Sequence, residues 1–496
     1  MDVATTSSFV RRWMDAEEDP INPPGSVSSP LPGADARLSA LAARARADLH
    51  ALRHPEADWM PEPACPNGKR MVDVLVVGAG QGGLSIAAHL IKERVNNILV
   101  IDKQSRGNEG IWNSHGRMPV IRSPKHYPGP DLGIPNLTYE SWHRAVFGDV
   151  AWAHLSLVPI QEWVRYLNWI RDALALPVEN RVELTDIKPG PDCLEVTLKR
   201  SSGTETRYVR RLILATGHDG TGDWWLPDWI ATLPTHLRAQ AADPIDFDQL
   251  CQKRVAILGI GATGGDNAIC ALEAGAEVHM FCRRDTHRRQ QVYRWCITAG
   301  FLRNFHHLDD ARRWRFMHYI LNTRMGMPPE TWKRLSRFKT FTLHTNANWR
   351  AVQPKGSGVL IDTEEGPFQA DFVICCAGHD QDVRKRQELA NLADDIALWS
   401  DRHVPIPELT DRRLARYPYL GADFTFQEKV PGAAPWLARI HDFTFGPTMS
   451  FGPSGCSIST LRLTVPMLVN GVTQGLFVED ADHHWRSLLD HPDYIP

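Results

Sequence analysis

Long apolar runs and a strong excess of either charge are both missing from this sequence. No apolar stretch approaches the roughly 20 residues that a bilayer-spanning helix needs. Arg11 and Arg12 stand among polar residues, without the apolar core of a signal peptide. The formal net charge is only −3, so no basic surface for nucleic acid or anionic lipid is indicated. We therefore expect no membrane or nucleic-acid partner and a cytoplasmic location.

Cysteine pairs of the CxxC type are also absent. The nine cysteines are scattered and odd in number, which is typical of a reducing compartment rather than of a disulfide framework. Cys375 and Cys376 are adjacent within an apolar run. Because neighbouring side chains of a strand point to opposite faces, a redox disulfide between them is disfavoured. We interpret them as buried structural thiols.

Metal-ligand spacing is equally scarce. Among the 21 histidines, only His50 and His54 have the HxxxH spacing of a helical metal pair. Pro55 disfavours helix at His54, and no third ligand stands nearby. We therefore predict no metal site.

Two glycine-rich turns, about 180 residues apart, are what the sequence does contain. The first follows the mostly apolar run 72–77, and its residues are Gly78, Ala79, Gly80, Gln81, Gly82 and Gly83. In such a turn the first glycine permits a tight bend, the second lets the backbone approach a pyrophosphate, and the last lets helix and strand pack closely. The next apolar run ends at Asp102, 24 residues after Gly78, near the spacing of an acid that binds a ribose 2′-OH. An adenine dinucleotide with a free ribose is predicted.

The second turn follows the apolar run 255–258 and has the opposite charge after its second strand. Its residues are Gly259, Ile260, Gly261, Ala262, Thr263 and Gly264. The strand that follows ends at Arg283 and Arg284, whose guanidinium groups offer planar bidentate donors to a 2′-phosphate that a carboxylate would repel. This pattern favours NADP over NAD. An arginine pair at a strand end is otherwise typical of a solvated face.

The motifs resemble those of the flavin-containing monooxygenase and N-hydroxylating monooxygenase superfamily over residues 70–480. Residues 259–266 are similar to the Gly-x-Gly-x-Ser-Gly-x-Asp segment that opens its NADPH domain, with Thr263 in place of Ser. Residues 110–112 resemble its Gly-x-Trp element near the flavin, and residues 215–217 its Ala-Thr-Gly linker. The resemblance implies FAD in the first unit and NADPH in the second.

The cofactor contacts that follow from the turns and the resemblance fall into two sets. Those expected for FAD are Gly78, Gly80, Gly82, Gly83, Asp102, Lys103, Trp112, Thr216, Gly217 and Ser454. Those expected for NADPH are Gly259, Gly261, Thr263, Gly264, Arg283 and Arg284. Ser454 belongs to the stretch 449–457, which resembles the segment that meets the flavin ring. A tight loop with a helix cap is the alternative interpretation of that stretch.

Departures from the superfamily leave the catalytic residues open. Of its Phe-x-Gly-x-x-x-His fingerprint, only the histidine, His236, is present. The Asn that helps to position the oxygenated flavin in flavin-containing monooxygenases is missing from residues 120–125. Arg122 and Lys125 in that stretch are candidates to supply a cation near the flavin or the NADP phosphate, and ordinary loop charges are the equal alternative. We expect a divergent branch with its own substrate.

The resemblance implies a flavin-dependent NADPH monooxygenase. NADPH reduces FAD, reduced flavin reacts with O₂, and a flavin C4a-(hydro)peroxide oxygenates a small organic substrate, while the protein positions the cofactor and excludes water. Oxygenation at N or S is expected first. Baeyer–Villiger oxidation of a ketone, which needs a cationic group near the charged intermediate, is the nearest alternative.

Two other functions stay open at this point. A flavoprotein reductase of disulfides needs a cysteine pair, but a reductase that serves a quinone or a protein partner does not. A non-catalytic dinucleotide sensor is the alternative from another class. Two intact glycine turns count against a sensor, since it needs only one of them.

We predict an α/β fold with two Rossmann-like dinucleotide-binding domains. The FAD-binding domain is expected to comprise residues 69–220 and 377–496, and the inserted NADPH-binding domain residues 221–376. Residues 1–68 are expected to form a helical N-terminal extension. Its patch over 34–52 has apolar residues on one face and is expected to pack on the main body, with a dimer contact, and hence a homo-oligomer, as the alternative.

Further elements are expected from apolar periodicity. Helical patterns cover residues 163–174 and 312–338, and alternating strand patterns lie between 182 and 209. Buried strands are expected over 212–217 and 372–377, each leading into a tight turn.

Overall fold

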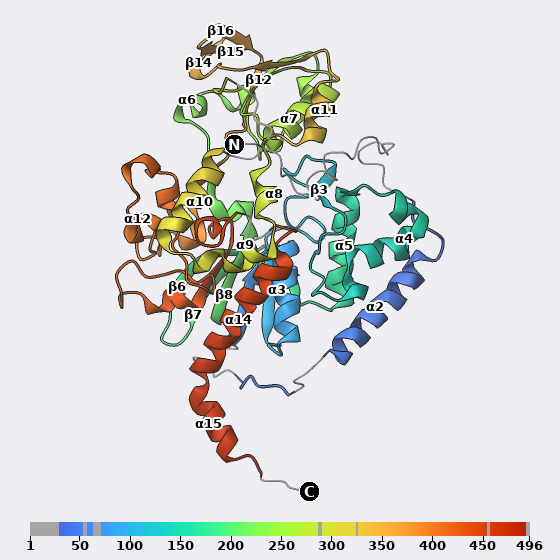
Figure 1. The fold of residues 1–496 in the computed structure, drawn as a ribbon, viewed down its shortest axis with the longest axis vertical. Coiled ribbons are helices and arrows are strands. Elements are labelled where there is room, and N and C mark those ends of the chain that lie inside the picture. Colours follow the sequence, from blue (N-terminus) through green and yellow to red (C-terminus); the bar gives the residue numbers. More distant parts are fainter. Residues whose placement is uncertain are drawn as a thin grey trace, which may run out of the picture.

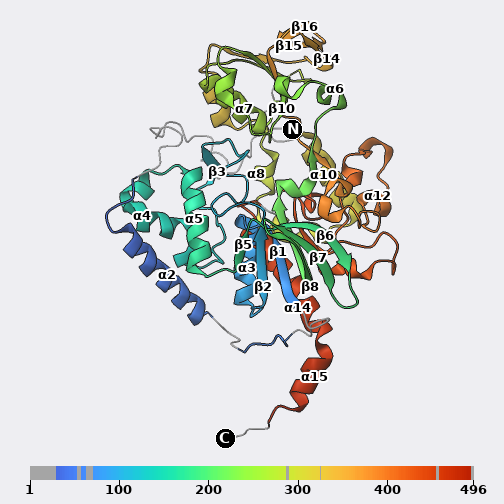
Figure 2. The same ribbon diagram turned by 180° about the vertical axis from the view of Figure 1, so that it is seen from behind.

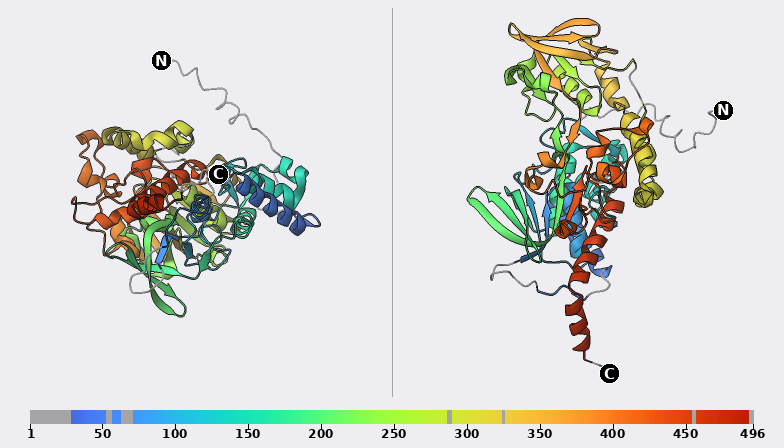
Figure 3. Two further views of the ribbon diagram at one scale, coloured as in Figure 1. Left: turned by 90° about the horizontal axis from the view of Figure 1, so that it is seen from below. Right: turned by 90° about the vertical axis from the view of Figure 1, so that its left-hand side faces the viewer.

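The computed structural model describes residues 29–52, 57–62, 71–285, 290–323, 326–453 and 457–492. The predictions for Ser454 and for His54 lie outside these residues. The molecule is elongated, with one sheet at an end, a larger sheet in the middle and helix α15 (Ala481–Leu489) projecting at the other end (Figure 1, Figure 3).

The larger sheet has seven strands in the order β5-β2-β1-β8-β7-β6, with β19 also paired to β8. Its strands are β1 (Met71–Val77), β2 (Ile98–Asp102), β5 (Val178–Asn180), β6 (Glu183–Pro189), β7 (Leu194–Arg200), β8 (Gly203–Gly217) and β19 (Ile440–Thr444). Strands β5, β2, β1, β8 and β19 are parallel, and β7 and β6 continue the sheet antiparallel. Every residue of β1 is buried, as expected for an apolar run with both faces covered.

Helices cover this sheet and connect its parallel strands. Helix α3 (Gln81–Lys92) follows β1, and most of its residues are buried. The C-terminal helix α14 (Leu461–Glu479) packs beside α3 (Figure 2). Helix α5 (Ile160–Ala173) confirms the helix expected over 163–174. Strands β6 to β8 likewise confirm the strand region between 182 and 209.

The second sheet has five parallel strands in the order β10-β17-β11-β12-β13. They are β10 (Arg238–Gln240), β11 (Arg254–Leu258), β12 (Glu277–Phe281), β13 (Phe341–His344) and β17 (Phe372–Cys375). Helices α7 (Ala262–Glu273) and α11 (Pro329–Leu335) contribute to the core on one face. The antiparallel strands β14 (Trp349–Lys355), β15 (Gly358–Thr363) and β16 (Gly366–Ala370) contribute to the core on the other.

The adjacent cysteines contribute to these two cores separately. Cys375 belongs to the core beneath β14 to β16, and Cys376 to the core beneath α7. Burial raises the pKa of the Cys375 thiol to about 11. The expectation of buried structural thiols on opposite faces is therefore confirmed.

The chain crosses between the two sheets twice, and the two crossings pair with each other. Strand β9 (Gly222–Trp224) follows β8 on the way out, and β18 (His379–Gln381) follows β17 on the way back. They form a two-stranded antiparallel ribbon. The strands of the larger sheet thus come from residues 71–217 and 440–444, and those of the second sheet from 238–375. The domain boundaries stay a prediction.

One helical segment between β12 and β13 packs away from the second sheet. It contains α8 (Val292–Cys296), α9 (Ala299–Asn304) and α10 (Asp310–Thr323). Its buried side chains share a core with residues 399–449, in which Trp314 and Trp399 are fully buried. The helical pattern expected over 312–338 is two helices, α10 and α11, because the prolines at 328 and 329 cannot continue a helix.

The helical extension packs on the main body, as the sequence predicts. Helix α2 (Ala34–Ala51) lies against α4 (Tyr139–His154) and α5 (Figure 1). Arg37 donates to the backbone oxygen of Ala145 at 2.6 Å, and Arg46 to that of Ala173 at 3.1 Å. The remaining short elements are β3 (Val120–Pro124), β4 (Leu157–Pro159), α6 (Asp228–Ala231), α12 (Trp399–Arg402) and α13 (Thr448–Phe451). Among the described residues, no helix is both long and apolar enough to cross a membrane.

Candidate functional site

The first glycine turn lies between β1 and α3, and its glycines have different steric surroundings. Gly78 has φ +106°, and a Cβ there would lie 2.5 Å from the carbonyl oxygen of Ala215. A Cβ at Gly83 would overlap the carbonyl oxygen of Gly78. At Gly80, by contrast, the nearest atom would be Cα of Gly110 at 3.7 Å, an ordinary contact. The first and last glycines are therefore required by the fold, whereas the fold alone does not require a glycine at position 80, where the open backbone fits close approach of a pyrophosphate.

Asp102 lies at the end of β2, beside this turn, and is buried. Its Oδ2 accepts from the Ala79 N–H and its Oδ1 from the Gln104 N–H, both at 2.8 Å. Burial raises the pKa of this carboxyl group, and the two backbone N–H groups oppose that shift. Each carboxylate oxygen has two lone pairs, so each keeps the capacity to accept from a ribose hydroxyl.

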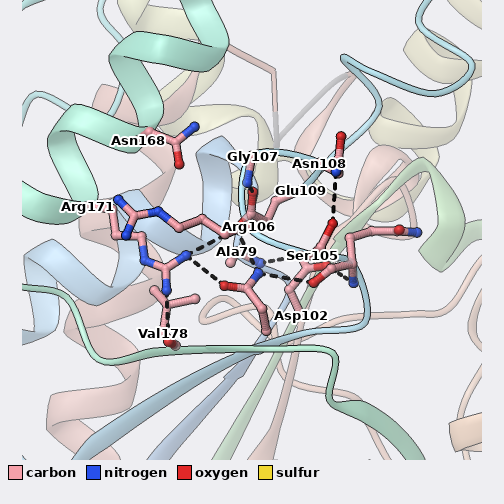
Figure 4. A network of polar contacts seen from close by, with 12 residues as sticks. Ala79, Asp102, Ser105, Arg106, Gly107, Asn108, Glu109, Asn168, Arg171 and Val178 are labelled. Carbon is pink, nitrogen blue, oxygen red and sulfur yellow. Dashed lines mark hydrogen bonds and ion pairs between the residues drawn. The ribbon is translucent and has the colours of Figure 1, made fainter. Parts of the chain in front are cut away.

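A second carboxylate that the sequence analysis missed lies next to Asp102. Glu109 accepts from the Gly107 N–H at 2.6 Å, from Asn180 at 2.7 Å and from Arg171 at 3.2 Å (Figure 4). These side chains come from the loop after β2, from α5 and from β5. Glu109 and Arg171 border a small crevice that is also lined by Ala79, Leu84, Gly107, Trp112, Val164, Leu167 and Asn168. The predicted contact Trp112 therefore lies in the same crevice as the turn residue Ala79.

The linker motif at the end of β8 supplies an unsatisfied polar atom. Thr216 Oγ1 is buried and has no hydrogen-bond partner within the described part of the chain. Gly217, the next residue, has φ +60°. Because a buried hydroxyl without a partner is costly, Thr216 fits a bound polar ligand such as FAD. Lys103, in contrast, forms an ion pair with Asp219 at 3.1 Å, which joins the loop after β2 to the loop after β8.

The second glycine turn has the same positive φ at its first glycine and the same close backbone contacts as the first turn. Gly259 has φ +107°, and a Cβ there would overlap the carbonyl oxygen of Cys376, the counterpart of Ala215. A Cβ at Gly264 would overlap the carbonyl oxygen of Gly259, whereas a Cβ at Gly261 would meet nothing within 4 Å. Thr263 lies half-buried in the first turn of α7. The second turn therefore fits a second dinucleotide.

The two arginines after β12 have different surroundings. Arg283 is exposed. Arg284 is half-buried and donates to the backbone oxygens of Asn322 at 2.9 Å and Thr323 at 3.3 Å. Arg284 therefore anchors the end of α10, and Arg283 presents its guanidinium to solvent.

The three candidate catalytic residues do not come together. Arg122 donates to Asp266 and, at 3.3 Å, to Thr331, so it bridges β3 to the helices of the second sheet. Lys125 donates to the Trp152 backbone oxygen at 2.7 Å, and its ammonium lies 4.5 Å from the centre of that indole ring. His236 is exposed on a short 3₁₀ helix, 235–237. Their catalytic roles stay predictions.

An aromatic cluster forms where α9 and the residues after it meet α13, with Phe305 and Phe451 buried and Phe301 and His306 half-buried. Phe301 and Phe305 have ring centres 4.8 Å apart, and His306 stacks on Phe451 at 5.2 Å. Gly452 follows α13, and a Cβ there would lie 2.7 Å from the Phe301 ring. Burial lowers the pKa of His306 to about 4, so this histidine is neutral at physiological pH. We call these four side chains, Phe301, Phe305, His306 and Phe451, the aromatic wall.

The two crossings between the sheets carry a histidine pair. His218 follows the linker motif, His379 follows the equivalent turn after β17, and their rings are 3.0 Å apart from Nδ1 of His218 to Nε2 of His379. Thr221 Oγ1 donates to the His218 backbone oxygen at 2.8 Å and therefore accepts from Nδ1 of His379 at 3.2 Å. Trp224 and Phe445 pack against the pair. Burial lowers the pKa of His218 to about 3 and that of His379 to about 4.

Comparison with known proteins connects this geometry to a family. A family model described as FAD-NAD(P)-binding matches residues 75–219. The chain is 36% identical over 435 residues to the FAD-dependent urate hydroxylase of Xanthomonas campestris pv. campestris, which covers 87% of this chain and 92% of that protein.

Solved structures show the same fold at lower identity. Ornithine hydroxylase from Pseudomonas aeruginosa matches with a TM-score of 0.64 at 16% identity, over 82% of this chain and 100% of that chain. L-lysine 6-monooxygenase from Pseudomonas syringae matches with a TM-score of 0.62 at 16% identity, over 81% of this chain and 99% of that chain. The α/β fold with two Rossmann-type units that the sequence predicts is confirmed.

The family relationship favours oxygenation over the reductase and sensor alternatives. The residues present at both glycine turns fit the cofactors FAD and NADPH, and the family acts on small molecules with O₂. The resemblance found in the sequence is thus confirmed. This chain belongs to the same family as the Xanthomonas urate hydroxylase, and it is an FAD- and NADPH-dependent monooxygenase with the fold of the N-hydroxylating enzymes.

Proposed function

We propose that this monooxygenase hydroxylates a small, planar, nitrogen-rich heterocycle of the urate class. The observation that carries the proposal is the extent of the match to the Xanthomonas urate hydroxylase, which includes both glycine turns and nearly the whole of that protein. The overall reaction is S + O₂ + NADPH + H⁺ → SO + H₂O + NADP⁺, in which S is the heterocycle.

The aromatic wall supports a planar substrate. Aromatic rings bind flat heterocycles by offset stacking. Phe301 and His306 are half-buried and can contact such a ring, whereas Phe305 and Phe451 are buried and support them, Phe451 by stacking on both His306 and Phe424. Neutral His306 offers one ring nitrogen as donor and the other as acceptor. We propose that this wall forms one side of the substrate pocket, where it also keeps water out.

The cofactor roles proposed for individual residues follow from their surroundings. Asp102 would hold the ribose of FAD, Gly80 would admit its pyrophosphate, and Thr216 would donate its unsatisfied hydroxyl. Gly261 would admit the pyrophosphate of NADPH, and Arg283 would donate to its 2′-phosphate. When bound, FAD accepts a hydride from NADPH and activates O₂. We propose the FAD domain as residues 69–220 with 377–496 and the NADPH domain as 221–376.

The test is a substrate screen with the purified, FAD-loaded protein. Urate, L-ornithine, a thioether and a cyclic ketone are each supplied with NADPH and O₂, and NADPH consumption is compared with product formation by mass spectrometry. We expect urate to give a product one oxygen atom heavier, with one NADPH consumed for each product molecule. Coupled oxygenation of ornithine or the thioether alone would establish N- or S-oxygenation instead. An ester or lactone from the ketone would establish Baeyer–Villiger oxidation.

A further inference from the structure

A cavity of about 310 Å³ lies between α3 and α14. Its volume is within the range of small-molecule pockets. The side chains that line it come from three elements: Ser85, His89, Lys92, Glu93, Gly129, Leu132, Arg462, Pro466, Val469, Asn470 and Thr473. No residue of either predicted cofactor set is among them.

The cavity lies between two helix faces. Helices that pack directly against each other normally do so through apolar side chains. On α3 the lining residues are spaced as i, i+4, i+7 and i+8, from Ser85 to Glu93. On α14 they are spaced as i, i+4, i+7, i+8 and i+11, from Arg462 to Thr473. Each set therefore forms one stripe along its helix. Most of these side chains are polar, although α3 is otherwise buried and largely apolar, so the gap is not built for helix packing alone.

His89 offers a fixed hydrogen-bond acceptor at this cavity. It is 8% exposed, and its Nδ1 lies 3.0 Å from the backbone oxygen of Ser85. A carbonyl oxygen only accepts, so Nδ1 carries the proton. Burial lowers the pKa of His89 to about 4, which keeps the ring neutral at physiological pH. Nε2 of His89 therefore carries a lone pair and accepts.

Two cationic side chains at the cavity are hydrogen-bond donors and attract an anionic group. Arg462 is half-exposed and lies 3.2 Å from Asp131, and Lys92 lies 3.5 Å from Glu93. Lys92 and Glu93 are both exposed, and because such a surface ion pair contributes little, the long Lys92 side chain is able to turn toward a ligand. Arg462 stays beside Asp131, whose side chain is only 2% exposed, and its guanidinium has further N–H donors for a ligand. The amide of Asn470, which also lines the cavity, adds a donor and an acceptor.

We infer that this cavity is a second ligand site, which binds a small organic anion that also carries an N–H donor. Its carboxylate or equivalent anionic oxygen contacts Arg462 and Lys92, and its N–H donates to Nε2 of His89. The inference rests on the cavity alone and does not depend on the proposed substrate.

Isothermal titration calorimetry of the full-length, FAD-loaded protein tests this inference with three related probes. Orotate combines a carboxylate with ring N–H groups, uracil has the ring without the carboxylate, and benzoate has a carboxylate without N–H. We expect orotate to bind with an affinity about tenfold or more above that of uracil and of benzoate, since each loses one charge-assisted or buried hydrogen bond. Equal affinities for the three probes, or no binding of orotate, would overturn the inference.

Matched variants locate the binding. Arg462→Met is expected to weaken orotate binding about tenfold or more. Arg413→Met is the control, because Arg413 is 48% exposed beside a mostly buried aspartate, as Arg462 is 50% exposed beside Asp131, and it should leave the affinity unchanged. His89→Leu is expected to weaken orotate but not benzoate. If Arg462→Met retains FAD and binds orotate like the wild type, the anion binds elsewhere and the inference is wrong.

Discussion

At the scale of single residues, the two adjacent arginines after β12 have different surroundings and different expected roles. Arg284 donates to two backbone oxygens at the end of α10, so its guanidinium is used within the protein. Arg283 is exposed at the strand end where Rossmann units recognise the ribose of the coenzyme. Preference for NADPH is therefore expected to depend on Arg283 far more than on Arg284.

Arg283→Ala is expected to raise the KM for NADPH about tenfold or more and to leave the KM for NADH nearly unchanged. The reason is that only NADPH loses a charge-assisted contact to its 2′-phosphate, worth roughly 1.5–3 kcal/mol. Steady-state kinetics with both coenzymes measure the effect. Arg284→Ala is the matched control, which should lower thermal stability without changing the ratio of the two KM values. If Arg283→Ala raised the KM values for NADPH and NADH equally, Arg283 would not be the residue that contacts the 2′-phosphate.

At the scale of elements, strands and turns with strong local signals follow the sequence closely. Strand β1 is apolar except for Asp73, strand β11 is apolar after Arg254, and both end in glycine turns. A parallel strand buried on both faces has that composition. The packing of α8 to α10 on residues 399–449 was not foreseen, because it depends on contacts between segments that no local pattern connects. Glu109 and Arg171 were missed for the same reason, since they lie 62 positions apart.

Variants of two glycines in the first turn distinguish an effect on folding from an effect on FAD binding. Gly83→Ala is expected to lower the melting temperature of the protein strongly, because its Cβ would overlap the Gly78 carbonyl oxygen. Gly80→Ala is expected to fold normally, since its Cβ would meet only an ordinary contact at 3.7 Å, but to bind FAD about tenfold or more weakly by loss of backbone contact with the pyrophosphate. Circular dichroism and flavin fluorescence measure the two effects. Full FAD retention in Gly80→Ala would show that the pyrophosphate lies elsewhere.

The core formed by α10 and residues 399–449 is expected to be essential for stability. Trp314 is 1% exposed and packs near Trp399, so Trp314→Ala should lower the free energy of unfolding by about 3–5 kcal/mol through lost burial and the cavity left behind. Trp295, 63% exposed in neighbouring α8, is the matched control, and Trp295→Ala should cost less than about 1 kcal/mol. Urea denaturation compares them. Similar losses for both variants would mean that this core is not a separate stabilising unit.

At the scale of the whole molecule, contacts between the two sheets hold the cofactor turns in relation to each other. Arg122 bridges β3 to Asp266 at the start of α7. The ribbon of β9 and β18 joins the sheets, and the His218–His379 pair lies at its base. Both histidines are neutral in the folded protein because burial lowers their pKa values.

The histidine pair predicts a dependence of stability on pH. Their pKa values are about 3 and about 4 in the folded protein, against 6.5 for an ordinary histidine. Between pH 6.5 and about 4 the unfolded chain therefore binds more protons than the folded one, and stability falls as the pH falls. Replacing both histidines by Gln is expected to make the decline shallower than in the wild type. Denaturation at a series of pH values measures the free energy of unfolding. The same decline with falling pH in the double variant as in the wild type would contradict the prediction.

The most direct test of this account is to supply isotopically labelled O₂ to the FAD-loaded enzyme with NADPH and urate, and to measure the label in the product by mass spectrometry. We expect one labelled oxygen atom in each product molecule and one NADPH consumed for each. Product oxygen that comes from water, or NADPH consumption that yields only hydrogen peroxide, would contradict it.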